Sequence, residues 1–172
     1  KQLKPPTGAT FCGLMIGENS SRYLLASDAG YGFVATLEDL LTRNKSGKAA
    51  LSARGAGVLA PQRVFEYEDD WVAAITDTGR LLIFPLAELP LLPKGKGVKL
   101  INIPGPRHKA GEEKLTAVAV FREGDALRLF AGKQNMRLKP SDIDTFAGSR
   151  AQRGRVLPRG YQRPTAIEAM PA

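Results

Sequence analysis

The chain has 172 residues and a net charge of +8, with 25 Lys and Arg residues against 17 Asp and Glu residues. It is long enough to bury a hydrophobic core, and its cationic excess indicates a polyanion such as nucleic acid as partner. No apolar run approaches the roughly 18–20 residues of a membrane span. The single cysteine, Cys12, excludes an internal disulfide and a cysteine-cluster metal site, and favours a reducing, cytoplasmic compartment.

The first predicted unit is a series of short strands. Thr10–Ile16 is a candidate strand, and Cys12 within it is interpreted as a small core residue. Arg22–Ser27 and Phe33–Thr36 are expected to form a hairpin, because the glycines of the intervening Asp28–Gly32 segment tolerate the positive φ that tight turns require. The hairpin is followed by a short amphipathic turn (37–41), a basic loop (42–48) and the start of another strand (49–51).

A second unit repeats this order about 50 residues later. Trp71–Ile75 and Leu81–Phe84 flank the turn Asp77–Arg80, which corresponds to the turn of the first hairpin. The basic loop Lys94–Gly97 matches Lys45–Lys48 of the first unit, allowing one inserted residue, and is followed by another strand. The chain therefore indicates an internal repeat.

A third copy is weaker. Leu127–Phe130 and Met136–Lys139 flank the turn Gly132-Lys133. Gly148–Arg155 is another basic, glycine-containing loop, and a final strand is expected after Pro164.

Each unit is preceded by a further strand, so each holds about four strands: Gly13–Ile16, Gln62–Tyr67 and Leu115–Phe121. Repeats of this length are typical of propeller-like blades, which bury their apolar faces against their neighbours. We predict one all-β domain over residues 1–172, with approximate blades at 9–60, 61–112 and 113–168. No helix longer than two turns is expected. Because the chain begins with Lys1 and not Met, we interpret it as part of a longer polypeptide.

Candidate catalytic and metal-binding groups are few. His108 is the only histidine and lies in a polar stretch without a Ser or Cys motif, so a loop residue is favoured over a catalyst. Lys94–Gly97 lacks the Lys-Ser/Thr end of a Walker loop. The acidic run Glu66–Asp70 lacks calcium-loop spacing and is interpreted as a solvated loop. We predict no catalytic residue, no metal site and no cofactor in this domain.

The basic residues are better placed for function, because they gather on turns, loops and strand ends beside glycine. Backbone N–H groups and cationic side chains can approach phosphate together at such places. Nothing resembles a recognition helix or a base-stacking platform, so we expect weakly sequence-dependent, salt-sensitive contacts with duplex phosphates. The candidate DNA-binding residues are Arg43, Lys45, Lys48, Lys94, Lys96, Lys99, Arg107, Lys109, Lys133, Arg137, Lys139, Arg150, Arg153, Arg155 and Arg159.

Three stretches, in this order, carry a resemblance to a known family: Ala26–Phe33, Gly79–Pro85 and Lys94–Pro104. They resemble the C-terminal domain of the A subunit of bacterial topoisomerase IV (ParC), which is related to that of gyrase A, and Lys133–Arg163 is similar to the end of the ParC chain. The resemblance implies a β-pinwheel, here of about three four-stranded blades in an open or partial disc. Its basic rim is expected to bind and bend duplex DNA, helping to select the transported segment and substrate topology during decatenation and supercoil relaxation.

The resemblance also implies what the rest of the parent protein does. The parent is expected to be an ATP-dependent, magnesium-using type II topoisomerase of two A and two B subunits. We expect it in the cytoplasm on the chromosome, and peripheral membrane association of the parent is compatible with this. None of Tyr23, Tyr31, Tyr67 and Tyr161 matches the family's catalytic motif, so this chain is predicted not to be an enzyme by itself. Family pinwheels usually have more blades, and the Gln-Arg-Arg-Gly-Gly-Lys-Gly box of gyrase is absent.

Two alternatives stay open at this stage. One is the DNA-wrapping C-terminal domain of gyrase A, and the other is a propeller-like scaffold for protein interactions. A scaffold is expected to show little affinity for DNA and little salt effect. A small hydrolase would need a nucleophile and a base that the chain does not offer.

Overall fold

The computed structural model describes residues 2–172, so Lys1, the first residue of the predicted domain, lies outside the described residues. The strands are β1 (Arg22–Ala26), β2 (Tyr31–Thr36), β3 (Gln62–Val64), β4 (Trp71–Thr76), β5 (Arg80–Pro85), β6 (Val98–Lys99), β7 (Leu115–Phe121), β8 (Ala126–Ala131), β9 (Gln134–Leu138), β10 (Arg155–Val156) and β11 (Ala166–Met170). The helical elements are α1 (Leu37–Leu40), η1 (Leu86–Glu88), α2 (Gly105–Lys109), α3 (Pro140–Ile143) and η2 (Asp144–Phe146). Within residues 2–172 no helix exceeds two turns, as expected, and none is long and apolar enough to cross a membrane.

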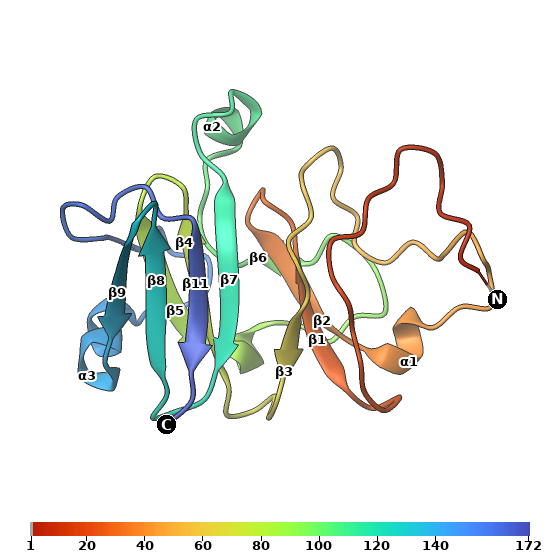
Figure 1. Ribbon diagram of the computed structural model, residues 1–172, viewed down its shortest axis with the longest axis horizontal. Coiled ribbons are helices and arrows are strands. Elements are labelled where there is room, and N and C mark those ends of the chain that lie inside the picture. Colours follow the sequence, from red (N-terminus) through yellow and green to blue (C-terminus); the bar gives the residue numbers. More distant parts are fainter. Residues whose placement is uncertain (1) are drawn as a thin grey trace.

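The strands form three sheets whose pairs are all antiparallel (Figure 1). Their strand orders are β3-β1-β2-β6, β10-β5-β4-β7 and β11-β8-β9. One hydrophobic cluster packs Leu24 and Val34 of the first sheet against Phe84 of the second. Another packs Ile83 of the second sheet against Leu127 of the third. No cluster of the described residues joins the first sheet to the third, so the sheets form an open row.

The second sheet is covered on both faces, and this explains its apolar strands. Along β4, Val72 and Ala74 belong to the cluster shared with the first sheet, whereas Ala73 and Ile75 belong to the cluster shared with the third. This division follows from the alternation of side chains along a strand. All four side chains are fully buried. A strand covered on both sides reads as a continuous apolar run, which is why polar residues do not alternate here.

The three predicted hairpins are confirmed. β1–β2, β4–β5 and β8–β9 pair in antiparallel register, and each turn contains a glycine with positive φ: Gly30 (+87°), Gly79 (+82°) and Gly132 (+60°). The strand expected after Pro164 is also present, as β11 beside β8.

The sheets do not follow contiguous stretches of sequence, and in this they differ from the expected blades at 9–60, 61–112 and 113–168. β3 and β6, both from the second range, complete the first sheet, and β7 and β10, from the third range, complete the second. Consecutive repeats therefore exchange strands. The repeat pattern shows the period of the units, but the sheet that a strand joins depends on which neighbouring edge is open to it.

A glycine allows β6 and β10 to approach the neighbouring sheet. Gly97 precedes β6 with φ +78°, and a Cβ added there would overlap the carbonyl oxygen of Gly32 in β2. Gly154 precedes β10 with φ +74°, and its added Cβ would lie 2.8 Å from the carbonyl oxygen of Leu81. Gly47 holds the equivalent place in the first repeat with φ +93°, but nothing lies within 4 Å of its added Cβ.

The prediction of a strand at Thr10–Ile16 is wrong. No strand forms there, and the side chains of Phe11 and Leu14 are 80% and 78% exposed. Cys12 is exposed as well and is not a core residue. The equivalent strands β3 and β7 each pair with the hairpin that precedes them, and no hairpin precedes residues 10–16 in the described chain. An apolar strand pattern without a partner edge therefore stays unpaired.

The acidic run Glu66–Asp70 is only partly the solvated loop that was expected. Asp70 is 1% exposed, and its Oδ2 accepts hydrogen bonds from the N–H groups of Phe65 (2.6 Å) and Glu66 (3.0 Å). Burial raises the pKa of this carboxyl, against the lowering effect of these two hydrogen bonds. The carboxylate closes the turn before β4, and spacing alone does not distinguish it from its exposed neighbours.

We expect Gly97→Ala to destabilise the domain far more than Gly47→Ala. Both substitutions place alanine in the left-handed region, at a cost of about 1–2 kcal/mol. Only the first adds an overlap with a backbone oxygen, so its total loss in the free energy of unfolding should exceed about 3 kcal/mol. Urea titration followed by circular dichroism measures both. Equal losses for the two variants would contradict the close approach of β6 to β2.

Candidate nucleic-acid interface

A cleft of about 580 Å³ collects basic side chains from separate parts of the chain. Its cationic members, which we call the basic cleft, are Arg54, Lys96, Lys99 and Lys109. They come from the loop between α1 and β3, from the loop and strand that end in β6, and from α2. Tyr31 and His108 line the same cleft. Strand exchange creates this site, because β6 carries the second repeat's lysines onto the first sheet.

Tyr31 orders the two central lysines. It pairs with Lys99 across β2 and β6, and Lys96 Nζ lies 3.8 Å from the centroid of its ring. A cation–π contact at such a site contributes about 0.5–1 kcal/mol. Lys99 Nζ donates to Asn102 Oδ1 at 3.2 Å. Neither lysine takes part in an ion pair of the described residues, so both charges are available to a ligand.

The helix α2 is fixed above the turn of the first hairpin. His108 Nε2 and Asp28 Oδ1 lie 2.7 Å apart, and both side chains are about one-fifth exposed. The sequence predicted a loop residue at 108, whereas His108 lies in the short helix and holds it to the β1–β2 turn. Lys109 is consequently held at the border of the basic cleft, and α2 projects beyond the sheet edge (Figure 1).

Sequence reasoning missed Arg54. Its backbone has φ +50°, a conformation that non-glycine residues rarely adopt, and its exposed side chain lines the basic cleft. The signal that could have found it is present in the sequence, because Arg54 stands directly before Gly55. The same pairing of a cation with glycine identified Lys96 and Arg153.

Arg153 is brought near the cleft but is committed to another partner. Its guanidinium donates to both carboxylate oxygens of Glu113, at 2.7 and 2.6 Å, and to the carbonyl of Asn102 at 3.0 Å. Glu113 is 1% exposed. Burial raises the pKa of Glu113, but hydrogen bonds from Arg153 and Thr78 outweigh burial and hold the pKa below its ordinary value. Arg153 therefore acts within the protein, and we leave it out of the proposed DNA contacts.

Two more predicted arginines flank the cleft. Arg150 donates from Nη1 to the carbonyl of Lys99 at 2.8 Å, so it lies against the strand that carries Lys99. Arg107, in α2, has Nε 3.4 Å from Glu112 Oε2 and Nη1 3.8 Å from Glu113 Oε2, but unlike Arg153 it remains almost half exposed. Both extend the positive surface around the four cleft residues.

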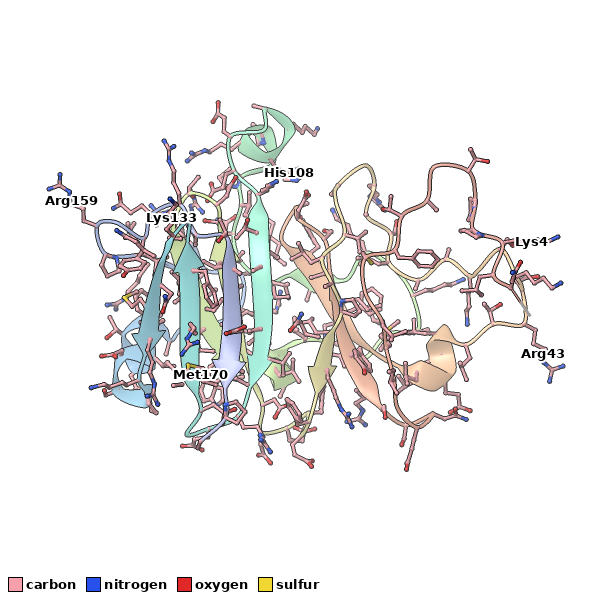
Figure 2. The ribbon with its side chains drawn as sticks, viewed as in Figure 1. Lys4, Arg43, His108, Lys133, Arg159 and Met170 are labelled. Atoms are coloured by element: carbon pink, nitrogen blue, oxygen red, sulfur yellow. The ribbon has the colours of Figure 1, made fainter. Side chains whose placement is uncertain are left out.

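The other nine predicted residues are exposed and lie outside the cleft: Arg43, Lys45, Lys48, Lys94, Lys133, Arg137, Lys139, Arg155 and Arg159. In Figure 2, Lys133 and Arg159 lie at the same edge of the molecule as His108, whereas Arg43 lies at the far end beside Lys4. The structure thus brings Lys96, Lys99 and Lys109 together and leaves the Arg43 loop apart from them. Within residues 2–172, no group of three or more His, Cys, Asp or Glu side chains could hold a metal ion.

A family model described as the DNA gyrase C-terminal domain, beta-propeller, matches residues 22–57 and 70–122. The chain belongs to this family. The predicted all-β, pinwheel class is thereby confirmed, with three sheets in the described residues.

Among curated relatives, the chain is 48% identical over 163 residues to the A subunit of DNA topoisomerase 4 from Pseudomonas aeruginosa, covering 94% of this chain. It is 39% identical over 167 residues to the Escherichia coli K12 protein of the same name, covering 97% of this chain. The chain spans 22% of the length of each relative.

Solved structures show the same fold. The E. coli ParC C-terminal domain matches with a TM-score of 0.88 at 38% identity, covering 99% of this chain and 69% of that one. A DNA gyrase A C-terminal domain matches with a TM-score of 0.68 at 17% identity, covering 90% and 50%, a likeness of fold alone.

We expect Glu113→Gln to lower the free energy of unfolding by about 3 kcal/mol at pH 7, because it leaves Arg153 without its buried counter-charge. A depressed pKa stabilises the folded state above the ordinary carboxyl pKa of 4.5, and this contribution is lost as the pH falls through the lower folded-state value. The difference between wild type and variant should therefore be full above pH 4.5 and shrink below it. Urea titrations at several pH values measure this, with Glu112→Gln at the exposed neighbour as control. A difference that is independent of pH would contradict the ion pair.

Proposed function

We propose that this chain is a non-catalytic, DNA-binding domain from the A subunit of topoisomerase IV. The observation that carries the proposal is the convergence of Arg54, Lys96, Lys99 and Lys109 on one cleft. The 48% identity to a relative of that name supports it and favours topoisomerase IV over gyrase as the parent. The net charge of +8 also supports DNA binding, since a basic surface attracts a polyanion.

The proposed interaction is electrostatic. Duplex DNA carries one negative charge per about 1.7 Å of helix axis, so four clustered cations can neutralise several adjacent phosphates and release their counterions. Arg107 and Arg150 extend the contact on either side of the cleft. Lys133 and Arg159, at the same edge in Figure 2, offer further phosphate contacts to a duplex that bends along that edge. Contacts of this kind do not read base edges, so recognition is weakly dependent on sequence.

The proposal assigns catalysis to other parts of the parent protein. DNA cleavage, ATP hydrolysis with magnesium, and assembly of two A and two B subunits into an A2B2 enzyme belong outside this chain. In this proposal the domain itself binds duplex DNA of the chromosome, in the cytoplasm. It helps to select the transported segment during decatenation and supercoil relaxation.

The triple variant Arg54→Gln, Lys96→Gln and Lys109→Gln should weaken binding to a short random-sequence duplex roughly tenfold or more at moderate salt. The slope of log Kd against log salt concentration should fall by about 1 for each phosphate that the variant no longer binds. Fluorescence anisotropy at four or more salt concentrations measures both quantities.

The matched control removes three cations that lie outside the cleft, by Lys4→Gln, Arg63→Gln and Arg122→Gln. It changes the net charge equally, so it separates a local interface from a general charge effect. If the two triple variants lose the same affinity and the same slope, the basic cleft is not the interface. If wild type itself binds weakly and without salt dependence, the domain is a protein scaffold.

A further inference from the structure

The edge of the molecule opposite α2 carries a second cleft, of opposite charge. It has a volume of about 520 Å³ and lies where β7 ends and β4 begins. We call it the acidic cleft; its charged lining consists of Glu66, Glu68, Asp69, Asp70, Glu123 and one cation, Arg122. In Figure 2, Met170 of β11, which pairs with Ala126 at the start of β8, lies in the lower part of the molecule, away from His108 and Lys133.

The five carboxylates of the acidic cleft outnumber its single cation. None of the five takes part in an ion pair of the described residues, although the chain carries 25 cations. Arg122, the only cation in the lining, lies over the ring of Phe65, at 4.9 Å from its centroid. Like charges gathered without partners repel one another, so a bound cation would relieve this repulsion.

Asp70 gives an independent indication of a ligand. Its Oδ2 accepts two backbone hydrogen bonds, whereas its Oδ1 is buried and has no hydrogen-bond partner. Buried polar atoms are nearly always paired, because an unpaired one costs about 1–3 kcal/mol. Asp70 is 1% exposed and belongs to the lining of the cleft, so its carboxylate adds negative charge to the wall.

A partly apolar pocket adjoins the acidic cleft and shares Trp71 and Glu123 with it. This pocket has a volume of about 260 Å³; Phe121, Ile83 and Ile143 form its apolar lining, beside two further carboxylates. Trp71 stands between the two, with its ring packed against the hydrophobic cluster of the second and third sheets. A tryptophan face beside carboxylates is a favourable site for a Lys or Arg side chain. The neighbouring pocket accommodates one apolar side chain.

We propose that the acidic cleft binds a basic peptide segment of a partner protein, with a Lys or Arg side chain beside Trp71 and Asp70 and an adjacent apolar side chain in the pocket. Charge complementarity carries this assignment. Nucleic acid does not fit, because five carboxylates repel phosphate. The partner therefore binds at the edge away from the basic cleft, and both ligands can be held at once.

Trp71 is the only tryptophan of the chain, so its fluorescence reports on this cleft. We would titrate the full chain with a ten-residue peptide that alternates Arg with Leu, and with a peptide in which Glu replaces Arg. The first should change the emission saturably, with a midpoint that rises with salt, and the second should not. Glu66→Gln/Glu68→Gln/Glu123→Gln, at exposed positions, should weaken binding of the basic peptide at least tenfold. The affinity for duplex DNA should stay within twofold.

Asp70→Asn removes the charge and keeps an oxygen for the hydrogen bonds from Phe65 and Glu66. This variant should bind the basic peptide at least threefold more weakly than wild type. The affinity is measured after circular dichroism shows that the variant is folded. If both charge variants bind the peptide as wild type does, the proposal is wrong. It is also wrong if magnesium alone produces the same saturable change, or if the emission changes only because two copies of the chain associate, which sedimentation velocity detects.

Discussion

The structure depends on the exchange of strands between consecutive repeats. β6 and β10 are only two residues long, yet each completes the sheet of the repeat before it, and a glycine lets each of them come close to that sheet. The residues just after β6, Leu100 and Ile101, are fully buried in the cluster between the first and second sheets. The loop that carries Lys96 therefore cannot move away without opening the core. A rigid, cationic surface arises from the same contacts that hold the sheets together.

The hairpins and part of the basic cleft were predictable from local sequence. Alternating or continuous apolar runs, with glycine at the turns, identified the three hairpins, and the pairing of a cation with glycine identified Lys96. The features that could not be predicted depend on distant partners. Arg153 and Arg155 look alike in the chain, but Arg153 meets Glu113 forty residues away, whereas Arg155 is exposed on an edge strand. Asp70 differs from its acidic neighbours only because the turn buries it, and Thr10–Ile16 has strand composition without an edge to pair with.

The two clefts lie near opposite ends of strand β7. β7 has seven residues and so spans about 20 Å, with α2 just before its first residue and the acidic cleft at its last. This separation exceeds the screening length of about 8 Å at physiological ionic strength, so the charges of one cleft act only weakly on the other. The net charge of +8 therefore conceals two surfaces of opposite sign, and the average composition describes neither of them.

The short helix α2 and the residues that follow it are tied to two other repeats. His108 joins it to Asp28 in the first hairpin, and Glu113, just beyond the helix, joins the same connection to Arg153 in the third repeat. The connection between the second repeat's basic loop and β7 thus links three successive repeats of the sequence. A mechanical load applied at this helix, such as tension in a bound polymer, is therefore passed to the first sheet through Asp28 and to the second sheet through Arg153, which lies just before β10.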